Sequence, residues 1–166
     1  MGYPILVLLS LSRGEASLCL GLYDPFYEEL FVGERGKGAF LNNKQIKVSD
    51  VTQLSRSLLC IGIHTRGNAN LKHGLSHFRK LLEVSGAFRR IGSTALEICY
   101  VACGRVEAHI NNNSDIHAIP AAKVILEEAG GKLTDFYGHP WDPNAGSVVA
   151  SNGHIHKELV ALLRDI

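Results

Sequence analysis

The chain has 166 residues, of which 46% are hydrophobic and 20% charged, and this is the composition of an ordinary globular domain. With a formal net charge of +1 and no basic run longer than Arg89-Arg90, binding to nucleic acid or to an anionic membrane is not expected. The four cysteines lie in apolar segments without a Cys-x-x-Cys pair, and the opening MGYPILVLLSLS lacks the features of a signal peptide, so we expect a reduced, cytoplasmic protein.

The first part of the chain is predicted to be a set of strands joined by turns. Apolar or alternating segments predict strands, in chain order, over residues 5–11, 17–23, 29–33, 39–48 and 58–63. Asp24-Pro25, the GERGKG stretch and Asn42-Asn43 supply the turns between them. The pattern indicates an antiparallel meander over about residues 1–63.

Helices and strands alternate in the rest of the chain. Leu71, Leu75, Phe78 and Leu82 recur at the spacing of one helix face and predict an amphipathic helix. Further helices are expected over 94–103, over 119–129 and from 155 onward, and strands over 88–91, 106–110, 132–136 and 147–151. Without any linker or repeat, the sequence predicts a single layered α/β domain over 1–166, with the alternating part from about 64 to 166.

Three motifs resemble binding sites but have simpler interpretations. GERGKG, residues 33–38, lies between two strands and lacks the spacing of a nucleotide-binding loop, so a hairpin turn is favoured. His73 and His77 could share a helix face, yet no third metal ligand is apparent, and two solvated histidines are favoured. Asp142 in HPWDPNAG is expected to bond to its own turn.

A fourth motif, IGSTALE at residues 91–97, is a stronger candidate for a binding site. Thr94-x-x-Glu97 has the spacing of a capping box, and Gly92-Ser93 precede it directly after a strand. Backbone N–H groups and the positive end of the helix dipole at such a start can also face an anion. Spacing alone favours a structural cap over a ligand site.

The stretch DIHAIPAAKVILEEAGG, residues 115–131, predicts another helix that begins near Pro120 and ends at Gly130-Gly131. The residues that would face a ligand lie just before Pro120. Ala118, at the place where a carboxylate could coordinate a metal, has no functional group.

Four phrases together resemble the inositol monophosphatase family of magnesium-dependent sugar phosphatases. They are YDPFYEELFVGERGKGAFLNNKQIKVSD (23–50), RRIGSTALEICYVACGRVEA (89–108), AAKVILEEAGGKLTD (121–135) and SVVASNG (147–153), in the order of the family. The resemblance implies an αβαβα sandwich, here incomplete at its N-terminus, and a phosphatase that uses two or three Mg²⁺ ions to hold phosphate and activate water.

The same resemblance shows which metal ligands are missing. The family takes them from an upstream glutamate, an upstream Asp-x-x-Asp-Gly-Thr motif and an aspartate that falls on Ala118, with His117 in the place of a tryptophan. Asp115 is the one nearby carboxylate that could substitute, at the cost of rearranging the helix start. No magnesium is therefore expected to bind to this chain alone.

The resemblance implies a substrate side lined by Gly92, Ser93, Thr94, Ala95 and, at the position of an acidic residue that contacts substrate hydroxyls, Asn111. The substrate is expected to be a small phosphorylated metabolite. Inositol phosphate, fructose bisphosphate, histidinol phosphate and nucleotide bisphosphates all remain open. The chain is expected to be inactive alone.

The alternative is a non-catalytic assembly or binding module that keeps the fold. A homo-oligomer is expected in either case. The apolar strand over 5–11 is flanked in the family by elements upstream of Met1, and without them an uncovered strand invites pairing with another chain.

Overall fold

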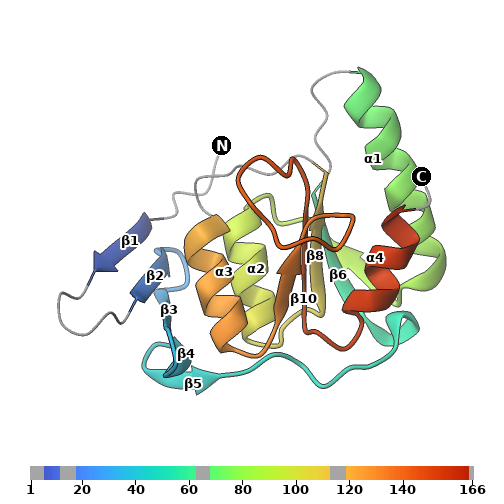
Figure 1. The fold of residues 1–166 in the computed structure, drawn as a ribbon. Coiled ribbons are helices and arrows are strands. Elements are labelled where there is room, and N and C mark those ends of the chain that lie inside the picture. Colours follow the sequence, from blue (N-terminus) through green and yellow to red (C-terminus); the bar gives the residue numbers. More distant parts are fainter. Residues whose placement is uncertain (1–5, 12–17, 63–67, 113–118, 165–166) are drawn as a thin grey trace.

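A computed structural model describes residues 6–11, 18–62, 68–112 and 119–164 of the chain (Figure 1). The first five strands form an antiparallel sheet in which neighbours in sequence are neighbours in space. They are β1 (Leu6–Leu11), β2 (Leu18–Asp24), β3 (Glu29–Glu34), β4 (Gly38–Leu41) and β5 (Lys44–Ile46). Asn42 and Asn43, both at positive φ, make the turn that divides the predicted 39–48 strand into β4 and β5.

The second sheet has the order β7-β6-β8-β10-β9. Its members are β6 (Leu58–Gly62), β7 (Ala87–Arg89), β8 (Ala108–Asn111), β9 (Lys132–Thr134) and β10 (Val148–Ser151). β6 runs parallel to β7 and β8, whereas β10 is antiparallel to β8 and β9. The meander therefore ends at Ile46 and does not extend to residue 63. The apolar run of β6 is buried on both faces, as strands in parallel sheets are.

Helices cover both faces of the second sheet, as Figure 1 shows. α2 (Thr94–Ala102) and α3 (Ile119–Glu128) lie between the two sheets and contribute to the largest apolar core. α1 (Asn68–Val84) and α4 (His156–Arg164) pack on the other face around a second core. The described elements thus form sheet, helix, sheet and helix layers, which confirms the predicted layered α/β sandwich.

The contact between α3 and the first sheet is unusually close. A Cβ atom on Gly33 of β3 would lie 2.8 Å from the Cα of Ile125 in α3. Glycine at residue 33 therefore lets the helix backbone rest directly on the strand. This contact packs α3 against the first sheet, and α2 lies beside α3.

α1 shows the main difference from the predicted pattern. Leu81 is fully buried and Phe78 partly so, whereas Leu75 is 49% exposed and Leu82 42% exposed. The buried face of α1 therefore includes Leu81 in place of the predicted Leu82, one residue away from the predicted stripe. The ring of His77 packs edge-on against Phe136 at 5.0 Å, so the prediction of a solvated histidine was wrong there. The side chains of Leu71 and His73 lie outside the described residues.

Two smaller findings complete the fold. A 3₁₀ turn, η1 (Leu54–Arg56), precedes β6 and was not predicted, because three residues are too few to show a period. Within the described ranges, no helix is both long and apolar enough to cross a membrane.

Candidate functional site at the start of helix α2

The GERGKG loop joins β3 to β4 as a hairpin turn, and its backbone donors already have a partner. The N–H groups of Gly36 and Gly38 donate to the two carboxylate oxygens of Glu128, each over 3.0 Å. Both glycines have positive φ. A carboxylate of the protein thus takes the donors that a phosphate would need. The interpretation as a structural turn is supported, and the predicted local role of Asp142 is confirmed by its bond from the Asn144 N–H.

The segment before α2 is shaped by Gly92 and Ser93. Gly92 has a φ of +94°, which a residue with a side chain rarely adopts. Ser93 is the N-cap, and its hydroxyl accepts a hydrogen bond from the N–H of Leu96. The predicted capping box is not formed, since Ser93 and not Thr94 is the N-cap and Glu97 accepts from the N–H groups of Ile91 and Gly92 instead.

Glu97 and His109 form a buried pair directly behind this helix start. Both are almost completely buried, and 2.6 Å separates Glu97 Oε2 from His109 Nδ1. Oε1 of Glu97 accepts hydrogen bonds from the N–H groups of Ile91, at 2.6 Å, and Gly92, at 2.9 Å. Burial alone would raise the pKa of Glu97, but the hydrogen bond and charge of His109 and the two N–H groups hold that pKa below its ordinary value.

The last residue of β8, Asn111, reaches the same helix start. Its Nδ2 donates to the hydroxyl oxygen of Thr94 over 3.1 Å. Gly62 of β6 lies opposite Asn111, and a Cβ there would be 2.6 Å from Asn111 Nδ2, so glycine leaves the space that this side chain occupies. The residues predicted to line the substrate side, 92–95 and 111, therefore lie together at one end of the second sheet. Their role in binding substrate stays a prediction.

Sequence reasoning missed Glu97 as a partner of His109. The signal was present, because a carboxylate stands in an otherwise apolar helix and a histidine in an apolar strand. Nothing in the spacing of eleven intervening residues identified the two as partners.

The predicted ligand position falls outside the described part of the chain. Ala118, His117 and Asp115 all lie in the segment 113–118, so the structure does not test the prediction made for them. Within the described residues, no three His, Cys, Asp or Glu side chains are grouped so that they could hold a metal ion. Asn111 is uncharged, and magnesium prefers carboxylate oxygens. The described residues do not fit a magnesium site, and we assign no step of chemistry to that metal here.

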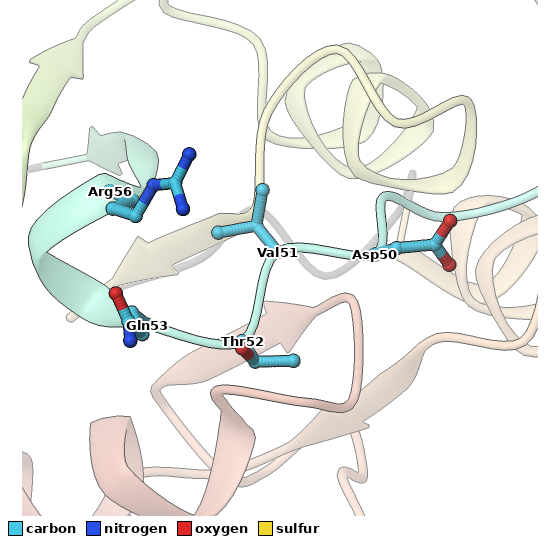
Figure 2. A pocket seen from close by; sticks show the side chains of 5 residues that line it. All are labelled: Asp50, Val51, Thr52, Gln53 and Arg56. Atoms are coloured by element: carbon cyan, nitrogen blue, oxygen red, sulfur yellow. The ribbon is translucent and has the colours of Figure 1, made fainter.

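Two surface cavities bear on ligand binding. One, of about 350 Å³, is lined by Asp50, Val51, Thr52, Gln53 and Arg56, and Figure 2 shows Asp50 pointing away from Arg56. Its polar groups do not converge on one point, so it offers no defined ligand site. The other, of about 310 Å³, lies beside the start of α2, where Ile91 and Leu96 line it together with Asp24, Tyr27, Arg90 and Tyr100.

Comparisons with known proteins agree with this architecture. Residues 7–166 match the model of the inositol monophosphatase family. The chain is 36% identical to inositol monophosphatase 1 of Solanum lycopersicum, a match that covers 98% of this chain and 61% of the relative. It is 33% identical to the Nus factor SuhB of Escherichia coli, covering 87% of this chain and 54% of that protein.

Solved structures give the same result. An inositol monophosphatase from Anabaena (Nostoc) superposes with a TM-score of 0.84 at 37% identity, over 89% of this chain and 61% of that one. The extragenic suppressor protein SuhB of Bartonella henselae superposes with a TM-score of 0.83 at 30% identity, over 88% of this chain and 56% of that one. The chain thus spans 54–61% of the length of these relatives, and it belongs to the inositol monophosphatase family.

Proposed function

We propose that this chain supplies the substrate-binding part of a family phosphatase that acts on a small phosphorylated metabolite. An inositol phosphate is the first candidate, because a relative that is 36% identical in sequence carries the name inositol monophosphatase 1. The observation that carries the proposal is the meeting of Thr94 and Asn111 at the start of α2. This places backbone donors, a hydroxyl and an amide within one small region.

The available donors follow from the bonds already made. The N–H groups of Gly92 and Leu96 donate to Glu97 and Ser93, so they are occupied within the protein. Thr94 and Ala95 lie in the first turn, where a helix supplies no acceptor for N–H groups and its dipole favours an anion. The hydroxyl of Thr94 accepts from Asn111, which leaves its own hydrogen to donate.

Binding and hydrolysis are separable in this proposal. The family typically depends on magnesium, which polarises phosphate oxygens and activates water when it is bound. The described residues do not offer it a ligand set, and Ala118 stands where the resemblance places a carboxylate. We therefore propose that the 166-residue chain binds a phosphorylated ligand through residues 93–95 and 111, with Gly92 shaping the turn, and does not hydrolyse it.

The test combines a binding and an activity measurement. Titration with myo-inositol 1-phosphate should shift the backbone amide signals of residues 93–95 in the NMR spectrum, and phosphate release with Mg²⁺ should not exceed the level in EDTA. Shifts spread evenly over the surface, or none, would contradict the binding site. Robust EDTA-sensitive turnover would contradict the proposed lack of activity.

A matched pair of variants tests the hydroxyl contact. Asn111→Ala should weaken binding of inositol 1-phosphate more than binding of inorganic phosphate, because only the former has ring hydroxyls. The neighbouring Asn112→Ala should change neither affinity. Equal losses for both ligands would show that Asn111 acts only by holding Thr94.

A non-catalytic role is the second candidate. It is favoured by the 33% identity to a protein named as a factor, the Nus factor SuhB of Escherichia coli. Under this proposal the chain keeps the fold to bind another protein or a second copy of itself. The absence of any response to inositol 1-phosphate or inorganic phosphate would favour this candidate over the first.

A further inference from the structure

Two side chains of β8 hold the first turn of α2 in place. His109 and Asn111 are two residues apart on a strand, so their side chains leave the same face of the sheet. One contacts Glu97 and the other Thr94, over 2.6 Å and 3.1 Å respectively. The helix start is thus fixed to the sheet at two points, three residues apart in the helix.

Glu97 carries this fixation on to the segment before the helix. A single oxygen, Oε1, accepts from the N–H groups of both Ile91 and Gly92. Because these two groups point to the buried carboxylate, they are turned away from any ligand. The positive φ of Gly92 then redirects the chain, and the donors that can face an anion begin at Ser93. The orientation of the binding turn therefore depends on a carboxylate that no ligand would touch.

We propose that Glu97 and His109 are positioning residues for anion binding at residues 93–95. His109 holds the carboxylate, and the carboxylate holds the backbone in the conformation that binds. This inference rests on the proposed function, since it assumes that phosphate binds at the start of α2. Preorganised donors bind more tightly because the ligand does not have to order them.

Two substitutions at Glu97 separate positioning from charge. Glu97→Ala releases both N–H groups, and the Kd for inorganic phosphate, measured from the amide shifts of residues 93–95, should rise at least tenfold. Glu97→Gln keeps an oxygen that can accept from both groups, and its amide can donate to His109 Nδ1 in one tautomer. Its Kd should stay within about threefold of the wild type. Such rescue by an uncharged isostere is the signature of positioning.

Glu128 supplies the matched control. Its carboxylate also accepts from two backbone N–H groups, those of Gly36 and Gly38, but on the far loop of the first sheet. Glu128→Ala should therefore lower the urea midpoint as Glu97→Ala does, while the Kd for phosphate remains that of the wild type. An equal rise of Kd in both alanine variants would assign the effect to general loss of stability and overturn the proposal.

His109→Leu decides the question if Glu97→Ala does not fold. It removes the bond to Glu97 and leaves the carboxylate in place. The amide hydrogens of Ile91 and Gly92 should then exchange faster, and the Kd for phosphate should rise at least threefold. Unchanged exchange and affinity would overturn the positioning role. If the wild type itself binds no phosphate at residues 93–95, both the proposed anion site and this inference are refuted. If the wild type and every variant bind phosphate equally well, only the positioning role of Glu97 and His109 is refuted.

Discussion

The buried imidazole of His156 is expected to make the protein sensitive to mild acid. His156 begins α4, with Nδ1 2.8 Å from the hydroxyl of Ser151 and Nε2 3.0 Å from that of Thr134. Thr134 donates its own hydrogen to the carbonyl of Asp135, so it must accept from His156 Nε2–H. Nδ1 is then the acceptor for Ser151. This network fits a neutral ring and gives no place to a second proton without rearrangement.

The magnitude follows from the pKa of His156. Burial, and to a smaller extent the positive charge of Lys132, lower that pKa from 6.5 to about 4. Below pH 6.5 the unfolded chain binds a proton that the folded protein does not, so stability falls with pH until the folded ring also titrates near 4. At ~1.4 kcal/mol per pH unit, the free energy of unfolding falls by about 3 kcal/mol between pH 6.5 and the folded pKa of His156. Of this, about 2 kcal/mol is lost by pH 5.

The assay is urea unfolding of the wild type and His156→Gln at pH 7.5 and pH 5.0. Gln keeps one acceptor and one donor but does not titrate. The free energy of unfolding of the wild type should fall by about 2 kcal/mol more than that of the variant. The pKa of the Glu97 carboxyl is lowered from 4.5, so its contribution to stability is lost only below the pH range of the assay. Equal losses in both proteins would refute a neutral, buried His156.

Three further predictions concern packing, thiols and assembly. Gly131→Ala should lower the free energy of unfolding by about 2 kcal/mol, because the new Cβ would overlap Leu126 Cδ1 and lie 2.8 Å from the carbonyl oxygen of Ser151; a wild-type urea midpoint would contradict this. Burial raises the pKa of Cys60 to about 12 and that of Cys99 well above its ordinary value, so both should resist thiol reagents at pH 8 until urea is added. β1 ends the first sheet with one edge unpaired among the described strands, and light scattering should show self-association that Leu8→Lys reduces. A concentration-independent monomer would contradict that expectation.

The fold could be predicted from local patterns to a large extent. The strands of the meander and the helices α2, α3 and α4 appear where expected, because α4 buries one apolar face and α2 and α3, between the sheets, are apolar on most sides. α1 was harder, since it carries more apolar residues than its buried face needs. Leu75 and Leu82 fit a helical stripe as well as Leu81 does, and the contact with α4 and Phe136 decides between them.

Long-range pairing explains why the sequence prediction assigned β6 to the first sheet, although it belongs to the second. Its sequence LLCIG predicts a strand, but the partner of a strand is set by the whole topology. β6 pairs with β8, which lies some fifty residues further along the chain. The two faces of β6 are both buried, and that feature distinguishes it from the alternating strands of the meander. The unbroken apolar run of β6 was therefore the sequence feature that indicated its position inside the second sheet.

The candidate site shows what a glycine-rich motif does and does not indicate. Both GERGKG and IGST contain glycine at positive φ and offer backbone N–H groups, and the sequence favours IGST as the anion site only because that motif begins a helix. The difference lies in a carboxylate from elsewhere in the fold. Glu128 takes the donors of the first loop, whereas Glu97 takes only the Ile91 and Gly92 N–H groups, which precede its helix, and none from the first turn of α2. Because Glu128 lies about ninety residues from its loop, no local pattern could reveal that its donors were already taken.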